Sequence, residues 1–162
     1  MKIINFSLLF ILLFSIPTKM HSQNIDPIFS KIKAITLRLK PGDDLKMQMD
    51  AFINKNKIKA ACIITCVGSL KQATIRYANK PNADTLHGHF EMVSLTGTLA
   101  ISGSHLHISI SDSTGKTIGG HLKEGSVIYT TAEVVLGIMP DLIFSRETDN
   151  TYGYKELMIK EK

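Results

Sequence analysis

Two alternating runs of apolar and polar residues flank a short turn in the second half of the chain, and this pattern constrains the fold more than any other. The runs cover residues 105–111 and 117–122, and the segment 112–116 between them (DSTGK) has the composition of a tight turn. A period of two residues is typical of β-strands with one buried face. The sequence therefore predicts an antiparallel β-hairpin.

The register of this hairpin follows if the turn centres on Thr114. His107 then lies opposite His121, and each face of the hairpin acquires a single character. One face is apolar, and the other collects His105, His107, Ser109, Ser111, Thr117 and His121. A slip by one residue would move His121 to a diagonal position or to the wrong face, so the pattern favours this pairing.

Three imidazoles on one face of two paired strands form a candidate metal site. Opposed residues have Cβ atoms about 5 Å apart and diagonal ones about 7 Å, so His105, His107 and His121 can converge on one ion. Three histidine ligands leave a coordination position open for water or a small-molecule ligand. Zn²⁺ is the expected ion, although Ni²⁺, Cu²⁺ or Fe²⁺ would accept the same ligands. The alternative is a polar face, wet or contacting another subunit, without an ion.

Glu133 is a further candidate because it interrupts an apolar run. A buried carboxylate needs a partner, so it could hydrogen-bond a ligand histidine from outside the ligand set, act as a general base, or pair with a lysine.

His87 and His89 form a second His-x-His without a third histidine nearby, and we expect them at the surface or at an interface. No nucleophile arrangement or phosphate-binding glycine loop is present in the sequence, so catalysis stays open.

The N-terminus predicts export. Lys2 precedes an apolar run over residues 3–16, and Pro17 and polar residues follow it. This is typical of a secretory signal peptide cleaved after Ser22; an uncleaved anchor is the alternative, although the run is short for a membrane span. We therefore expect a signal peptide over residues 1–22 and a periplasmic or secreted mature chain with no stable membrane span.

The remainder divides into a lead-in over residues 23–33 and one domain over residues 34–162. Asp43 or Asp44 can cap a helix over residues 45–56. Strands are expected at residues 34–39, 60–67, 73–77, 89–95, 97–102, 105–111, 117–122, 127–138, 142–145 and 156–159, with Gly68 ending the second. One early helix on a largely antiparallel sheet is an α+β layout.

The charge of the mature chain argues against nucleic-acid binding, and the spacing of its cysteines argues against a disulfide. Without Lys2 and Lys19, 17 of the 19 basic residues remain against 14 acidic ones, a net charge of +3. The basic residues are scattered, whereas a nucleic-acid-binding surface is usually dense and clustered. Cys62 and Cys66 lie roughly 13 Å apart along a predicted strand, too far for a disulfide, and we expect both on one face as small buried residues.

Several motifs follow one another in an order found in a known domain family. They are Arg38 with 41–45 (PGDDL), 61–70 (ACIITCVGSL), 90–99 (FEMVSLTGTL), His105-Leu106-His107, 119–122 (GGHL) and 131–136 (TAEVVL). On these motifs the chain resembles the plants-and-prokaryotes conserved (PPC) domain family, in its stand-alone prokaryotic form. The resemblance implies an α/β domain, a sheet with helix cover, that forms homotrimers. It also implies a zinc site at His105, His107 and His121.

Plant members of this family carry AT-hook segments that bind A·T-rich DNA, so the resemblance also raises a DNA-binding alternative. This sequence has no Arg-Gly-Arg-Pro hook, and His89 stands where the plant partner-binding motif carries an arginine. The leading hypothesis is an exported homotrimer that binds a transition metal and, through it, a small-molecule ligand. A DNA-binding protein and a metal-free trimerisation scaffold are the alternatives.

Overall fold

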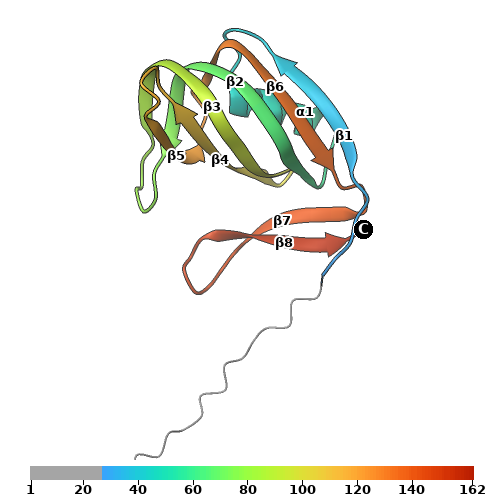
Figure 1. The fold of residues 1–162 in the computed structure, drawn as a ribbon. Helices are drawn as coiled ribbons and strands as arrows, with labels where there is room; N and C mark the ends of the chain where they lie inside the picture. Colours follow the sequence, from blue (N-terminus) through green and yellow to red (C-terminus); the bar gives the residue numbers. More distant parts are fainter. Residues whose placement is uncertain (1–26) are drawn as a thin grey trace, which may run out of the picture.

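A computed structural model describes residues 27–162, so the predicted signal peptide over residues 1–22 lies outside the described residues. Its elements are β1 (Lys33–Leu39), α1 (Leu45–Lys55), β2 (Ala61–Arg76), β3 (Asp84–Ala100), β4 (Gly103–Ser111), β5 (Thr117–Leu122), β6 (Val127–Ile138), β7 (Leu142–Thr148) and β8 (Lys155–Glu161). Six strands form one antiparallel sheet in the order β1-β6-β2-β3-β4-β5, and β7 and β8 form a separate hairpin (Figure 1). This mostly antiparallel sheet with one short helix agrees with the predicted α+β layout.

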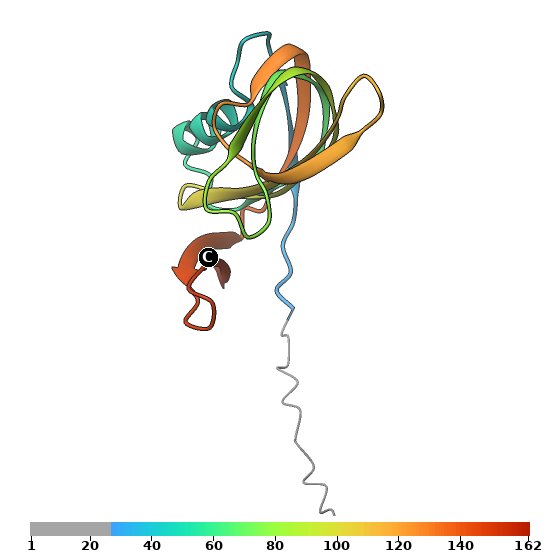
Figure 2. The same ribbon diagram turned by 90° about the vertical axis from the view of Figure 1, so that its left-hand side faces the viewer.

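The sheet curls until its last strand meets β2 again. β5 pairs with the end of β2 through Ile75 with Leu122 and Arg76 with His121. Strands β2, β3, β4 and β5 therefore close into a small barrel, which Figure 2 shows nearly end-on. The remaining strands, β6 and β1, extend the sheet from the edge of β2 opposite β3, and β5 pairs with the end of that same edge.

The predicted breaks at Gly68 and before Gly97 were wrong, because each glycine lies inside a long, bent strand. Gly68 has φ of +147°, and a Cβ there would lie 2.1 Å from the carbonyl oxygen of Thr131 on β6. Gly97 has φ of +134°, and a Cβ there would lie 2.0 Å from the carbonyl oxygen of His105 on β4. Both glycines permit close approach of a neighbouring strand, so each strand continues where the sequence predicted a break.

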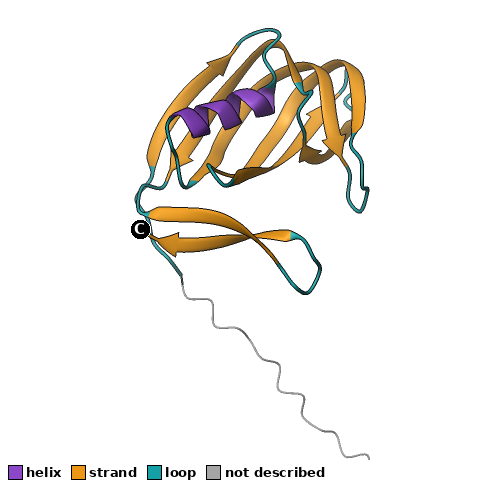
Figure 3. Ribbon diagram, turned by 180° about the vertical axis from the view of Figure 1, so that it is seen from behind, coloured by secondary structure: helices purple, strands orange, loops and turns teal. Residues whose placement is uncertain are grey.

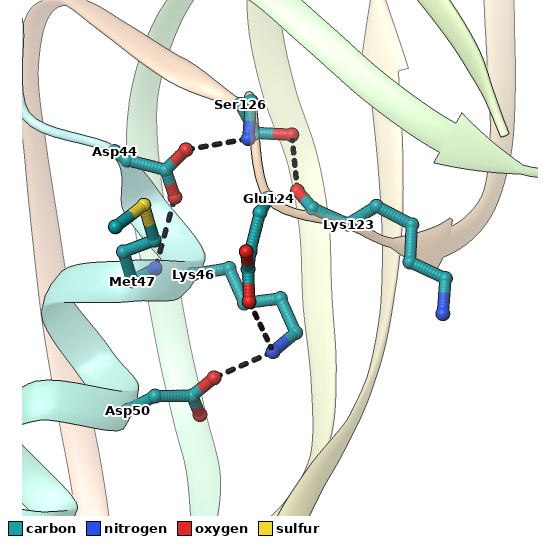
Figure 4. A network of polar contacts seen from close by, with 8 residues as sticks. Asp44, Lys46, Met47, Asp50, Lys123, Glu124 and Ser126 are labelled. Carbon is teal, nitrogen blue, oxygen red and sulfur yellow. Dashed lines mark hydrogen bonds and ion pairs between the residues drawn. The ribbon is translucent and has the colours of Figure 1, made fainter.

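Helix α1 lies across one face of the sheet (Figure 3) and buries Leu45, Met49 and Ile53 against it. Of the two predicted caps, Asp43 and Asp44, the structure has Asp44, whose carboxylate accepts a hydrogen bond of 2.9 Å from the Met47 amide. The same carboxylate accepts one of 2.6 Å from the Gly125 amide, in the connection between β5 and β6 (Figure 4). The cap thus ties the helix start to the loop that follows the histidine hairpin. Among residues 27–162, no helix is long and apolar enough to cross a membrane.

The two cysteines are free, as expected, but they do not share a face. Cys66 is buried in the main core with Ile63, whereas Cys62 is half-buried. The pairing of β2 with β6 shifts between Ile63 and Thr65, and this bulge reverses the alternation that the spacing of the cysteines implied. Burial raises the pKa of the Cys66 thiol to about 11, which makes it unreactive at neutral pH.

The substitution Gly97→Ala tests the close approach of β3 to β4. We expect it to lower the free energy of unfolding by about 3 kcal/mol or more in urea denaturation, because it combines backbone strain with a steric clash. Gly103→Ala is the matched control, since Gly103 also has a positive φ (+122°) but no atom within 4 Å of its added Cβ. An equal loss in the two variants would contradict the proposed clash.

Candidate metal centre

The hairpin that carries the histidines has the predicted register. In the pairing of β4 with β5, His107 lies opposite His121, and Ile110 lies opposite Ile118. Asp112 fixes the turn, because one of its carboxylate oxygens accepts hydrogen bonds from the Thr114 amide at 2.8 Å, the Thr114 hydroxyl at 2.6 Å and the Lys116 amide at 3.1 Å. These bonds hold the pKa of Asp112 below its usual value and keep the turn carboxylate ionised.

His105, His107 and His121 converge at one end of the barrel. Their ring centroids are 5.0 Å (105 to 107), 5.1 Å (105 to 121) and 4.4 Å (107 to 121) apart. One nitrogen of each ring lies within 4.8 Å of the others. Ligand nitrogens of a tetrahedral zinc ion lie about 3.4 Å apart, given Zn–N bonds near 2.0–2.1 Å. Small side-chain rotations bring the three rings to that spacing, so the donor set fits a transition metal ion.

Two glycines bring the strands of this site close enough together. A Cβ on Gly120 would lie 2.7 Å from the carbonyl oxygen of Arg76 on β2, and one on Gly119 would lie 2.7 Å from that of Ile108 on β4. Both glycines of this pair therefore permit close packing of β5 against its neighbouring strands. Gly120 allows β5 to reach the end of β2, and this contact places His121 beside Arg76.

The surroundings of the site favour neutral imidazoles. The pKa of His105 is lowered first by burial and then by nearby cationic groups, including Arg146, Arg76 and Lys123. The pKa of His121 is lowered by burial and by Arg76, while a hydrogen bond with the Arg76 backbone acts in the opposite direction. A neutral imidazole has a free nitrogen lone pair, and this is the form that binds a metal ion.

Glu133 does not lie near this site. It is exposed on β6, where its strand neighbours are Arg38 on β1 and Val67 on β2. No hydrogen bond or ion pair among the described residues involves its carboxylate. The apolar run around it was misread as burial on both faces; the side chain points to solvent and needs no protein partner.

The second His-x-His motif also lies outside the cluster. His87 and His89 are both exposed on β3, as expected of surface residues. His89 stacks on Tyr129 of β6, with ring centroids 4.1 Å apart. Within residues 27–162, the three-histidine group forms without either of them.

A cavity of about 620 Å³ adjoins the histidines, and most of its wall could not be predicted from local sequence patterns. Arg76, Lys123 and Arg146 line it together with His105 and His121. Lys123 follows His121 by two residues and could have been included with the hairpin. Arg76 and Arg146 lie far away in the sequence, and only the closure of the barrel and the position of β7 bring them to the site.

Comparison with protein families gives the context of this site. A family model described as the Plants and Prokaryotes Conserved domain matches residues 28–140. The chain belongs to this family. The match includes all three histidines and all six strands of the main sheet, and it confirms the resemblance inferred from the motifs.

Relatives of the chain differ widely in length and description. A protein from Synechococcus described as bifunctional protein GlmU is 42% identical over 129 residues, which is 80% of this chain but 20% of that protein. The chain thus spans about a fifth of the length of this relative. A protein of known structure from Salmonella enterica is 41% identical with a TM-score of 0.82, covering 83% of this chain and 98% of that one.

Two more distant structures share the fold. A protein from Archaeoglobus fulgidus, described as metal-containing, is 24% identical with a TM-score of 0.72 and covers 83% of this chain and 99% of its own. A protein from Bacteroides thetaiotaomicron, provisionally described as DNA-binding, is 19% identical with a TM-score of 0.68 and covers 80% of this chain and 96% of its own. The fold therefore occurs in proteins with different descriptions, and function has to be argued from the site.

Proposed function

We propose that this protein binds one divalent transition metal ion per chain through His105, His107 and His121, with zinc as the preferred ion. The observation that carries the proposal is the convergence of three imidazole nitrogens within 4.8 Å on two paired strands. The lowered pKa values of His105 and His121 support it, because both rings offer a lone pair at neutral pH. The description of the Archaeoglobus relative as metal-containing is consistent with the same use of the fold.

Zinc is preferred on ligand chemistry. Three imidazoles suit Zn²⁺, Cu²⁺, Ni²⁺ and Fe²⁺, and Zn²⁺ accepts the near-tetrahedral arrangement that three histidines on adjacent strands can form with a fourth, external ligand. The chain supplies three ligands from β4 and β5, so an external ligand would complete a four-coordinate site. When bound, the ion would act as a Lewis acid toward whatever occupies that position.

Metal analysis of the mature chain, residues 23–162 purified without a histidine tag, tests this proposal. We expect one zinc ion per chain by elemental analysis and its loss in the double variant His107→Ala/His121→Ala. His87→Ala is the matched control, because His87 is an exposed histidine outside the cluster, and it should retain the metal. Free zinc at 100 times its Kd should raise the stability of the metal-free wild type by about 2.7 kcal/mol. Absence of metal from the wild type, together with no stabilisation, would contradict the proposal.

We further propose that the chain is a homotrimer, as the family resemblance implies. Exposed apolar side chains on the outer face of the sheet support self-association. Val67 on β2 and Val93 on β3 are 55% and 57% exposed. They lie two residues beyond the Ser69–Glu91 pair on neighbouring strands, so they form one patch. Apolar patches of this kind are typical of subunit contacts.

Light scattering coupled to size exclusion tests the assembly. We expect the wild type to have three times the mass of the chain, and Val67→Glu/Val93→Glu to reduce it to the mass of one chain, because paired carboxylates cannot be buried at a contact. Met47→Glu is the control, since Met47 is equally exposed (55%) but lies on α1. A wild type that runs as a monomer would overturn the trimer.

Export is also part of the proposal, and it separates the metal-binding function from the DNA-binding alternative. Cell fractionation should find a chain that begins at Gln23, and only outside the cytoplasm. A full-length cytoplasmic chain whose affinity for duplex DNA falls steeply with salt would instead support the DNA-binding alternative.

A further inference from the structure

The cavity beside the histidines is strongly basic. Four of its lining residues, Arg76, Lys123, Arg146 and Lys155, are cationic, and one, Glu156, is anionic. The residues come from the end of β2, from the segment after β5 and from both strands of the β7–β8 hairpin. This hairpin lies below the barrel in Figure 1, and its turn is on the same side as the β4–β5 end. Two separate parts of the fold thus supply positive charge to one space.

Arg146 is held in place and retains free hydrogen-bond donors. Its guanidinium donates to the Thr98 hydroxyl at 3.2 Å and to the Lys155 carbonyl at 3.2 Å. A guanidinium carries five N–H donors, so three remain after these two bonds. Arg146 also lines a second, smaller cavity of about 260 Å³ that contacts His105 and His107. The guanidinium therefore stands directly beside the histidine cluster.

Lys123 has an ammonium that makes no hydrogen bond or ion pair with the described residues, unlike the ammonium of Lys46 on α1. Its backbone carbonyl accepts a hydrogen bond of 3.0 Å from the Ser126 hydroxyl, while its side chain extends away from the Asp44–Glu124 network (Figure 4). Lys46, by contrast, pairs with Asp50 and Glu124. Among the described residues, no ion pair involves the ammonium of Lys123.

A hydroxyl in the cavity wall is also unsatisfied. The Ser104 oxygen is buried and has no hydrogen-bond partner among the described residues. Ser104 lines the larger cavity and precedes the ligand histidine His105. Buried polar atoms without a partner are rare, so a ligand or ordered water at this wall would satisfy it.

These charges conflict with the metal site unless an anion lies between them. A divalent ion at the histidines and the cations Arg76, Lys123 and Arg146 would repel one another, because like charges at short range in a partly desolvated cavity interact strongly. A negatively charged ligand reverses the sign of both interactions. It can occupy the open coordination position and accept hydrogen bonds from a guanidinium at the same time.

We propose that the cavity binds a small organic or inorganic anion, whose carboxylate or phosphate group is held by Arg146 and Lys123 and approaches the metal ion at His105, His107 and His121. This inference rests on the proposed metal-binding function and names the class of ligand for the same site. A cavity of about 620 Å³ is large enough for a small metabolite. Guanidinium groups recognise both anions through paired N–H donors, so the two sources share one chemistry.

Isothermal titration calorimetry tests the proposal with two anionic probes, inorganic phosphate and succinate, and with succinamide as the neutral match for succinate. Each probe is titrated into zinc-loaded and chelator-treated protein, and metal content is measured on every sample. We expect one or both anions, but not succinamide, to bind zinc-loaded protein, and removal of zinc to weaken binding at least tenfold. The preferred anion distinguishes a phosphate ligand from a carboxylate ligand.

Variants assign the binding to the basic wall. Lys123→Gln and Arg146→Gln should each weaken anion binding about tenfold without changing the zinc content. Arg146→Lys should restore part of it, because the charge remains while the paired donors are lost. Lys116→Gln is the control, since Lys116 is an exposed cation at the turn of the same hairpin.

The outcomes separate the two proposals. Zinc-loaded wild type that binds neither anion, or that binds succinamide as well as succinate, overturns the anion site and leaves the metal site standing. Equal affinities in Arg146→Gln, Lys123→Gln and Lys116→Gln also overturn it. Wild type that never takes up metal overturns the proposed function, and anion binding that is then still lost in the Arg146 and Lys123 variants supports the basic wall alone.

Discussion

The short pairing between β5 and the end of β2 is the interaction on which the rest of this structure depends. It consists of the pairs Ile75–Leu122 and Arg76–His121. It closes four strands into a barrel and places Arg76 beside His121, the third histidine of the cluster that the β4–β5 hairpin forms. The pairing requires Gly120, because any side chain there would collide with the Arg76 carbonyl. A backbone contact of two residue pairs therefore determines the barrel and the position of one wall of the cavity beside the histidine cluster.

The local parts of the site could be predicted because they depend on short-range rules. Alternation and turn chemistry between residues 105 and 122 determine the hairpin register, and with it the cross-strand pair of His107 and His121. The helix cap at Asp44 could be predicted for the same reason, because it depends only on residues next to the start of the helix. The prediction that Glu133 is buried was wrong because the apolar run around it was interpreted as burial on both faces. In an antiparallel sheet every second residue of such a run can face solvent.

The parts that could not be predicted depend on long-range closure. Gly68 and Gly97 looked like strand ends, yet they permit bends within strands of 16 and 17 residues. No local pattern distinguishes the two cases, because the difference lies in which carbonyl approaches the glycine from a strand far away in the sequence. The same holds for Arg76 and Arg146. Both residues line the cavity beside the histidines, and the scattered positions of the basic residues along the chain do not predict this.

The β7–β8 hairpin has its own small core, separate from that of the barrel. Its buried residues Leu142 and Phe144 pack with Ala60 and Ala100, while the main cluster holds most of the large buried side chains. A unit with so little buried apolar surface has a lower local stability than the barrel. The hairpin that carries Arg146 can therefore separate transiently while the histidine strands stay paired. Such fraying would move Arg146 away from the histidines and leave the pairing of β4 with β5 intact.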